Sequence, residues 1–294
     1  MSKDKKNKAK RNPTALDTSA ICDELNFASR EAYKKLRTNV LFSFAEDGTC
    51  KVVGVTSSLR GEGKSVTAVN TAYTMAQSGK KVLIIDADMR IPTVAKKLNL
   101  TPTPGLSNLL VGVDKKDDII KHIRFEKTGV AFDVLTAGEL PPNPSELLGS
   151  KRMEALLETL KKHYNYIFID LPPVTAVADA VIFTKYADGM ILVVRQDYCR
   201  TDSLKETINQ LKFANANIIG FVYNCASTGS KIYGRKYAKY GKYSKYKNYS
   251  KYGKYYSKYY GKAYVDPSTY ENQMDDIQDI ADTPEEAENI DINV

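Results

Sequence analysis

Short apolar runs alternate with amphipathic stretches of helical period between residues 50 and 225. Most of these runs are continuously apolar and rich in β-branched residues, so each strand needs cover on both faces, as in a parallel sheet flanked by helices. The sequence therefore predicts an α/β fold with a doubly wound, mostly parallel sheet. The predicted strands span residues 51–56, 81–86, 132–136, 166–170, 190–194 and 218–223.

Amphipathic stretches around these runs predict the helices. Four follow the first strand, at residues 65–77, 145–163, 175–186 and 202–214, the last with Thr201 or Asp202 as its cap. A fifth, at 26–44, precedes the first strand and need not belong to the sheet. The segment 101–128 is rich in Pro, Gly and charge, which favours a loop with one or two short helices.

Charge divides the 294 residues into four parts. Residues 1–12 hold six basic residues and one acid, 13–226 are nearly neutral, 227–264 hold eleven basic residues and no acid, and 265–294 hold ten acids and no base. A lysine-rich segment without an aliphatic core cannot bury enough surface to fold alone. We predict a flexible basic arm at 1–25, a folded domain at 26–226, a disordered Lys/Tyr-rich tail at 227–264 and a disordered acidic C-terminus at 265–294.

Several classes of protein are excluded by simple counts. The four cysteines lie far apart, without the spacing of a zinc site or a disulfide framework, which fits a reducing compartment. No apolar run approaches the roughly 20 residues that span a bilayer, and no apolar segment follows the charged N-terminus. The sequence therefore predicts a cytoplasmic protein whose membrane role, if any, is peripheral or through a partner.

The segment 57–65 reads Ser-Ser-Leu-Arg-Gly-Glu-Gly-Lys-Ser, between a predicted strand and a predicted helix. In this context the pattern is typical of a phosphate-binding loop, although Ser58 replaces its usual first glycine; a plain glycine-rich turn is the alternative. Small residues let successive backbone N–H groups close on phosphate oxygens, Lys64 would reach the β- and γ-phosphates, and the Ser65 hydroxyl would ligate Mg²⁺. The predicted nucleotide-binding residues are Ser58, Arg60, Gly61, Glu62, Gly63, Lys64, Ser65 and Val66.

Carboxylates follow two of the predicted strands. Asp86 and Asp88 end one strand and Asp170 ends another, on the edge of an open α/β sheet where ligands bind. One carboxylate would hold Mg²⁺ through its water shell, and another would accept a proton from the attacking group. The alternative for a single strand-end aspartate is a helix cap or turn. Lys64, Asp86, Asp88 and Asp170 are the predicted catalytic residues, and the predicted Mg²⁺ ligands are Ser65, Asp86, Asp88 and Asp170.

Together these motifs resemble the bacterial tyrosine kinases of capsular and exopolysaccharide synthesis, in the Gram-positive form whose kinase is a separate cytoplasmic chain. The resemblance rests on residues 31–39, the loop 57–65, the Walker A′ segment 83–90, Walker B at 167–170 and a tyrosine-rich tail. It implies a P-loop fold with deviant Walker motifs and ATP- and Mg²⁺-dependent phosphorylation of protein tyrosines. By analogy with related ATPases, Asn224 would contact adenine. Arg60, in the loop, or Arg90, after the Walker A′ strand, would touch the γ-phosphate; the alternative for each is a solvated side chain.

The resemblance also implies partners. In the family, a Glu-x-x-Arg-x-x-Arg helix assembles a ring; here the motif reads Glu31-x-x-Lys34-x-x-Arg37, and lysine lacks the bidentate fork of arginine. The alternative for this helix is a solvated charged face. A transmembrane activator of the chain-length-determinant type would recruit the kinase to the inner face of the membrane through its cytoplasmic segment. A cognate tyrosine phosphatase would reverse the reaction, and the kinase would regulate polysaccharide synthesis and export.

Tyrosines repeat every three residues from 237 to 255 within the basic tail. At about 3.3 Å per residue, 38 residues span on the order of 120 Å, enough to enter the chain's own site or a neighbour's. Each phosphate adds about −1.5 to −2 charges, so roughly six or seven would cancel the tail's cations, which suggests a graded electrostatic switch. The predicted acceptors are Tyr233, Tyr237, Tyr240, Tyr243, Tyr246, Tyr249, Tyr252, Tyr255, Tyr256, Tyr259, Tyr260 and Tyr264.

Two other functions compete with the kinase. A partition or positioning ATPase of the ParA/MinD-like class would use the basic tail to bind nucleic acid or membrane. That class usually has lysine where this loop has Leu59, and the tyrosine tail also favours the kinase, so nucleic-acid binding is the weaker prediction. A non-catalytic scaffold with a sticky tail would show no ATP turnover.

Overall fold

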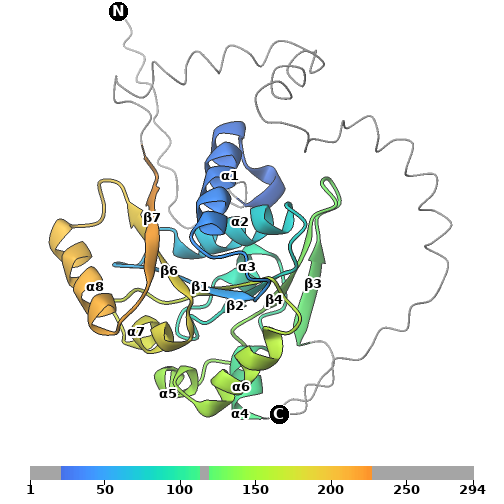
Figure 1. Cartoon of the computed structure of the whole chain (residues 1–294). Helices are drawn as coiled ribbons and strands as arrows, with labels where there is room; N and C mark the ends of the chain where they lie inside the picture. Colours follow the sequence, from blue (N-terminus) through green and yellow to red (C-terminus); the bar gives the residue numbers. More distant parts are fainter. Residues whose placement is uncertain (1–20, 113–118, 227–294) are drawn as a thin grey trace, which may run out of the picture. The chain divides into compact units, whose positions relative to one another are not determined.

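The computed structural model describes residues 21–112 and 119–226, which lie in one unit of the chain that ends at Ala226. The described residues form one seven-stranded sheet in the order β3-β4-β2-β5-β1-β6-β7 (Figure 1). All neighbouring strands are parallel except β3 and β4, which are antiparallel. The strands are β1 (Lys51–Ser57), β2 (Val82–Asp86), β3 (Ile120–Arg124), β4 (Ala131–Leu135), β5 (Tyr166–Asp170), β6 (Gly189–Arg195) and β7 (Ile218–Asn224).

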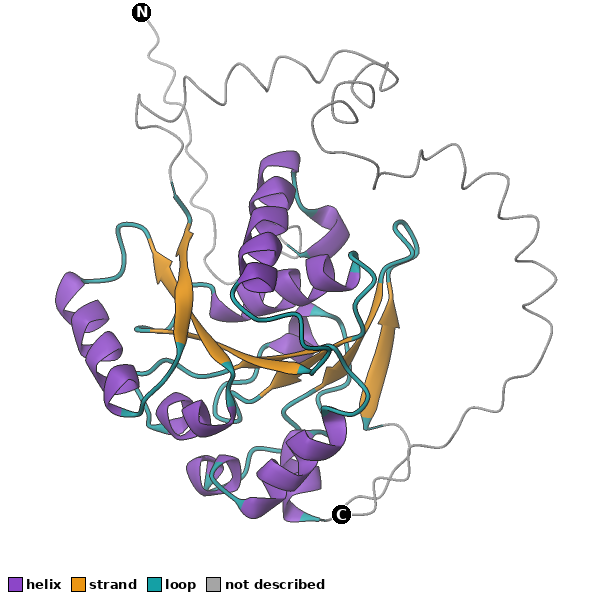
Figure 2. Cartoon of the chain, viewed as in Figure 1, coloured by secondary structure: helices purple, strands orange, loops and turns teal. Residues whose placement is uncertain are grey.

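Helices cover both faces of the sheet, as Figure 2 shows. Alternate residues of each parallel strand point to opposite faces, so Val53 and Val55 of β1 belong to one buried core and Val52 to the other. The first core includes residues of α1, α2 and α3, and the second includes residues of α4 to α8. The helices are α1 (Phe27–Phe42), α2 (Lys64–Ala76), α3 (Val94–Lys97), α4 (Leu106–Val111), α5 (Pro144–Leu148), α6 (Lys151–Leu160), α7 (Asp179–Phe183) and α8 (Thr201–Phe213).

The strand order reverses at β1, which lies between β5 and β6. The chain builds β2, β4 and β5 on one side of β1 and then crosses to place β6 and β7 on the other. In a doubly wound sheet, ligands bind outside the carboxyl ends of the strands at this switch point. The predicted doubly wound sheet is confirmed, and each of the six predicted strands is present.

One strand was absent from the sequence prediction. β3 falls in the segment 101–128, expected to be a loop with short helices; α4 confirms a short helix, but the prediction of no strand there was wrong. Among the described strands β3 is an edge strand that pairs only with β4, and none of its five residues is fully buried. A strand with solvent on one side does not show the continuous apolar run by which the central strands were recognised.

The predicted helices needed three corrections at their boundaries. The stretch 145–163 is two helices, because α5 ends before Gly149 and the Ser150 side chain caps α6 by accepting from the Met153 N–H at 3.2 Å. Helical structure predicted from residue 175 begins only at Asp179 and passes into a 3₁₀ turn, η3 (Thr184–Tyr186). The N-cap of α8 is Arg200, which makes no side-chain cap, rather than Thr201 or Asp202.

The N-terminal end of the described chain is packed against the domain. Residues 21–25, assigned from sequence to the flexible arm, include the 3₁₀ turn η2 (Cys22–Glu24). Cys22 is fully buried, and its backbone N–H donates to Asn70 Oδ1 of α2 at 2.7 Å. The packed region therefore begins before residue 26. All four cysteines lie in the described ranges, and all are free.

Candidate active site

A loop of nine residues, 57–65, joins the end of β1 to the start of α2 and is called the phosphate loop below. Gly61 and Gly63 have φ values of 87° and 96°, in the left-handed region that favours glycine. A Cβ atom at Gly63 would lie 2.1 Å from Asn224 Nδ2. A side chain at this position would therefore be both strained and in collision with β7.

The inner side of the phosphate loop offers hydrogen-bond donors. Among the described residues, the backbone N–H groups of Arg60 through Ser65 have no acceptor. The Glu62 side chain, by contrast, is fully buried and points into the protein, where it accepts from the Leu59 N–H at 2.7 Å. N–H groups gathered at a helix N-terminus form a site for an anion such as phosphate.

One lysine and three carboxylates meet beside this loop. Lys64 Nζ donates to Asp88 Oδ2 at 2.7 Å and lies 3.5 Å from Asp170 Oδ1. Asp86 and Asp170 end the neighbouring strands β2 and β5 and stand opposite each other in the register. The structure thus brings together all four predicted catalytic residues, called the Lys64 cluster below: Lys64, Asp86, Asp88 and Asp170.

The carboxylates of this cluster differ in how they are satisfied. Asp86 is fully buried and accepts from the backbone N–H groups of Thr93 and Val94, at 3.1 and 2.9 Å. Asp170 is also fully buried, but neither of its oxygens has a full hydrogen bond from the described residues. Buried polar oxygens without donors are costly, so Asp170 is suited to receive a ligand.

Burial and neighbouring charges shift the pKa values of Asp86, Asp170 and Lys64. Burial raises the pKa of Asp86, and the neighbouring Asp170 raises it further. Burial also raises the pKa of Asp170, an effect that Lys64 and the Ser65 hydroxyl oppose. Burial alone would lower the pKa of Lys64, but the carboxylates outweigh it and hold that pKa above its usual value. The lysine is therefore charged and outnumbered by acids.

A cavity of about 410 Å³ opens above the phosphate loop and the Lys64 cluster. Six predicted nucleotide-binding residues line it, whereas Ser58, Glu62 and Asn224 do not. Asn224 instead donates from Nδ2 to the Glu62 carbonyl at 2.8 Å. The predicted residues in the lining are Arg60, Gly61, Gly63, Lys64, Ser65 and Val66.

The same cavity has walls that the sequence analysis missed. Lys97 lines it one helical turn after Thr93, and burial lowers the pKa of Lys97. An apolar wall is contributed by Ile91 and by the turn after β5, including Pro172 and Pro173. Thr93 and Lys97 are four residues apart, a spacing that places two side chains on one face of a helix, and they follow the Walker A′ carboxylates closely. This spacing could have predicted that both side chains line the cavity.

The donors in this site suit magnesium better than a protein-only metal cage. Within the described ranges, no group of three or more His, Cys, Asp or Glu side chains is arranged to hold a metal ion by itself. Mg²⁺ usually keeps several waters and binds through one or two carboxylates together with substrate phosphates. The unsatisfied oxygens of Asp170, with Ser65 nearby, fit that mode of binding.

Comparisons with known proteins agree with this geometry. A family model described as an AAA domain matches residues 50–219. The chain is 37% identical over 194 residues to the putative tyrosine-protein kinase CapB of Staphylococcus aureus, an alignment that covers 66% of this chain and 83% of CapB. The chain belongs to the bacterial tyrosine kinases. It is an enzyme of the tyrosine-protein kinase class and has a nucleotide-binding P-loop fold.

Two solved structures share the fold. The kinase domain of the Escherichia coli tyrosine kinase ETK matches with a TM-score of 0.64 and 32% identity, over 76% of this kinase and 88% of that chain. The chimerical protein CapA2B2 matches with a TM-score of 0.60 and 37% identity, over 66% of this kinase and 83% of that chain. These matches confirm the predicted family and fold.

Arg90 of this kinase is engaged away from the phosphate loop. Its guanidinium donates from Nε to Asp179 Oδ2 at 2.9 Å and from Nη2 to Asp179 Oδ1 at 3.1 Å. The Ser145 hydroxyl donates to the same fully buried carboxylate and accepts from Arg90 Nη2 at 3.0 Å. Arg90, Ser145 and Asp179, called the Arg90 cluster below, link the Walker A′ segment to α5 and α7. Arg90 also lines the cavity above the phosphate loop, and its Nη1 has no hydrogen-bond partner among the described residues, so its contact with the γ-phosphate stays a prediction.

The helix predicted to assemble the kinase into a ring is α1. Lys34 Nζ bonds Glu31 Oε1 of the same helix at 2.9 Å, with both side chains exposed. Arg37 Nη1 donates to the Thr74 carbonyl of α2 at 3.0 Å. Within this chain, Glu31 and Lys34 therefore pair with each other on α1, and Arg37 joins α1 to α2.

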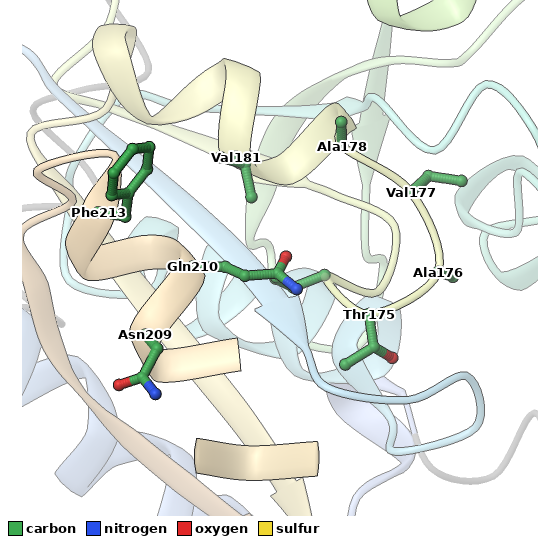
Figure 3. A pocket seen from close by; sticks show the side chains of 9 residues that line it. Thr175, Ala176, Val177, Ala178, Val181, Asn209, Gln210 and Phe213 are labelled. Atoms are coloured by element: carbon green, nitrogen blue, oxygen red, sulfur yellow. The ribbon is translucent and has the colours of Figure 1, made fainter. Parts of the chain in front are cut away.

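A second cavity, of about 580 Å³, lies beside the turn that follows β5 (Figure 3). It is lined by this turn, by Val181 of α7 and by Asn209, Gln210 and Phe213 of α8. None of the described residues that line it has a titratable side chain, so the acid–base groups of the site lie at the first cavity. Ala176 and Val177 line both cavities.

None of the helices in the described ranges is both long and apolar enough to cross a membrane.

Proposed function

We propose that this kinase transfers the γ-phosphoryl group of Mg·ATP to the twelve tyrosines of its own tail, from Tyr233 to Tyr264. These residues lie outside the described ranges. The observation that supports the proposal most strongly is the Lys64 cluster. It gathers a lysine and three strand-end carboxylates beside a loop whose N–H groups have no acceptor among the described residues.

The nucleotide phosphates would bind to the loop N–H groups and to the Lys64 ammonium group, which would exchange its bond to Asp88 for phosphate oxygens. Ser65, Asp170, Asp86 and Asp88 would hold Mg²⁺ directly or through water. When bound, the ion neutralises charge on the phosphates and helps to orient them. Arg60 lines the same cavity and would add positive charge. The adenine contact of Asn224 stays a prediction.

The acceptor tyrosine would attack in line. A phenol has a pKa of about 10, so it carries its proton at pH 7. Its oxygen forms a bond to the γ-phosphorus as the bond from that phosphorus to the bridging oxygen of ADP breaks. The proton passes to Asp88, which lines the cavity, rather than to Asp86, which is fully buried and already accepts from three backbone N–H groups. Positioning and electrostatics supply most of the rate enhancement.

Regulation is proposed to involve three partners. A transmembrane activator would recruit the kinase to the membrane through its cytoplasmic segment, and the name of the matching chimera, CapA2B2, is consistent with a two-protein system. A tyrosine phosphatase would remove the phosphates. Copies of the kinase would form a ring through Glu31, Lys34 and Arg37. The cellular role would be control of capsular or exopolysaccharide synthesis and export.

Phosphorylation would also change what the tail binds. The unmodified tail carries eleven basic residues and would attract anionic surfaces or the acidic residues 265–294, and the phosphorylated tail would release them. A salt titration of tail contacts before and after phosphorylation tests this switch. Identical salt dependence in the two states would contradict it.

The activity is tested by incubating the full-length protein with Mg·ATP, with and without the cytoplasmic segment of a candidate activator, and mapping phosphate by mass spectrometry. Lys64→Ala is compared with Lys80→Ala, a matched change at an exposed lysine before β2. The proposal expects phosphotyrosine between 233 and 264 in the parent and in Lys80→Ala, and none in Lys64→Ala. ATP hydrolysis with an unmodified tail would instead indicate a positioning ATPase, and absence of turnover would indicate a scaffold.

A further inference from the structure

The backbone carbonyls of the phosphate loop are anchored on its outer side. Five consecutive carbonyls, from residue 58 to residue 62, each accept a hydrogen bond from a side chain. A trans peptide unit points its C=O and its N–H in opposite directions, so carbonyls fixed outward turn the following N–H groups inward. The bonds are Thr175 Oγ1 to Ser58 O (2.6 Å), Ser57 Oγ to Leu59 O (2.8 Å), Tyr198 Oη to Arg60 O (2.9 Å), Arg195 Nη1 to Gly61 O (3.1 Å) and Asn224 Nδ2 to Glu62 O (2.8 Å).

Three of these donors belong to the last two strands of the described sheet or to the turn between β6 and α8. Arg195 ends β6, Tyr198 lies in the turn between β6 and α8, and Asn224 ends β7. We call Arg195, Tyr198 and Asn224 the loop clamp. Because β6 is the direct neighbour of β1, and β7 pairs with β6, the sheet itself places these donors beside the loop.

The clamp is reinforced by contacts among its own members and with Glu62. The Arg195 backbone N–H donates to Glu62 Oε1 at 3.3 Å, and its guanidinium lies 5.1 Å from the centre of the Tyr198 ring. A Cβ atom at Gly61 would lie 3.4 Å from Tyr198 Oη. The Tyr198 side chain therefore packs closely against Gly61 in addition to its hydrogen bond to the loop.

We infer that Tyr198 and Arg195 are positioning residues for the nucleotide phosphates. Neither lines the cavity, and the Tyr198 hydroxyl and the Arg195 guanidinium are bonded to the carbonyls of the loop. Both fix the carbonyls of Arg60 and Gly61, and so aim the N–H groups of Gly61 and Glu62 before the anion arrives. A preorganised set of donors binds phosphate without the cost of ordering the loop. The inference rests on the nucleotide-binding part of the proposed function.

The experiment measures binding of a fluorescent ADP analogue with Mg²⁺ to the full-length chain. Tyr198→Phe removes only the hydroxyl that donates to Arg60 O. We expect its dissociation constant to rise about three- to tenfold, the range for one lost hydrogen bond. Tyr223→Phe is the matched control, because Tyr223 is an exposed tyrosine of β7 without a hydrogen bond in the described part of the chain, and we expect no change.

A second pair of variants separates positioning from a general loss of structure. Arg195→Gln should weaken binding as Tyr198→Phe does, and Arg195→Lys, which keeps a positive donor, should retain more of the affinity. For Tyr198→Phe, we expect the thermal midpoint without nucleotide to equal that of the parent, and KM for ATP to rise while kcat changes less than twofold.

The outcomes distinguish the inference from the proposed function. Unchanged ADP affinity in Tyr198→Phe and Arg195→Gln, with the parent binding normally, would overturn the clamp and leave the kinase in place. A lower thermal midpoint that accounts for the whole loss of affinity would also overturn it. A parent chain that binds no nucleotide would overturn both.

Discussion

Two charge clusters border the same cavity, and they are built in opposite ways. In the Arg90 cluster, one buried carboxylate receives donors on both oxygens, two from a guanidinium and one from a hydroxyl. In the Lys64 cluster, three carboxylates share one lysine, and Asp170 has two buried oxygens without a full hydrogen bond from the described residues. Buried negative charge without a partner costs stability until a cation or donor binds. The closed cluster therefore suits a structural role and the open cluster suits a ligand.

The largest expected effect is the loss of activity when the carboxylate charge of Asp170 is removed from the Lys64 cluster. Asp170→Asn keeps the shape of the side chain and removes the charge proposed to hold Mg²⁺. We expect kcat/KM for tail phosphorylation to fall about 100- to 1,000-fold, the range for loss of one preorganised electrostatic group. Phosphate incorporation measured across Mg²⁺ concentrations tests this. Activity within threefold of the parent would mean that Asp170 is not needed to hold the ion.

The same variant, Asp170→Asn, is expected to be more stable than the parent at high pH. The folded protein raises the pKa of Asp170, so its ionised form is disfavoured by folding. Above the unfolded pKa of about 3.9 this lowers the stability of the parent, and the loss disappears as pH falls toward that value. Without metal or nucleotide, Asp170→Asn should therefore melt above the parent at pH 8, by a margin that shrinks toward pH 4. Thermal melting across this range is the measurement, and a variant less stable than the parent at pH 8 would contradict it.

The next effect in size comes from breaking the closed cluster. Arg90→Ala leaves Asp179 fully buried without its counter-ion. Breaking a buried pair costs about 3–5 kcal/mol, and we expect about 2–3 kcal/mol here because the Arg90 side chain is 39% exposed and partly screened by solvent. Urea unfolding gives the free energy directly. If stability hardly changed while phosphorylation were lost, Arg90 would act on the nucleotide, in agreement with the γ-phosphate contact predicted for Arg60 or Arg90.

A smaller effect is expected from the hydroxyl that completes this cluster. Ser145→Ala removes a donor to Asp179 while Arg90 keeps both of its bonds to that carboxylate. One hydrogen bond contributes about 1 kcal/mol, so the variant should lose about that much in urea unfolding and retain its activity. A loss as large as that of Arg90→Ala would show that the hydroxyl and the guanidinium act as one unit.

The two clusters also differ in how far the sequence revealed them. Lys64, Asp86, Asp88 and Asp170 were predicted because each stands in a local pattern, either a glycine-rich turn or the end of an apolar strand. The pairing of Arg90 with Asp179 was not predicted, because Asp179 is 89 residues away and its segment was read as the interior of a helix. Such contacts depend on the order of the strands in the sheet, which brings distant residues together, so no local sequence pattern predicts them. The same reason hid the loop clamp, whose donors lie more than 130 residues from the carbonyls they bind.

The smallest effect is expected at the ion pair between Lys34 and Glu31, which is exposed and lies within one helix. Such a pair contributes only about 0.3–0.5 kcal/mol, because water screens it and both side chains lose freedom. Lys34→Ala should therefore leave urea unfolding almost unchanged. Sedimentation of the unphosphorylated chain supplies the second measurement. Smaller assemblies at unchanged stability would place Lys34 in a contact between copies, as proposed for the ring, whereas unchanged assemblies would restrict it to the surface of α1.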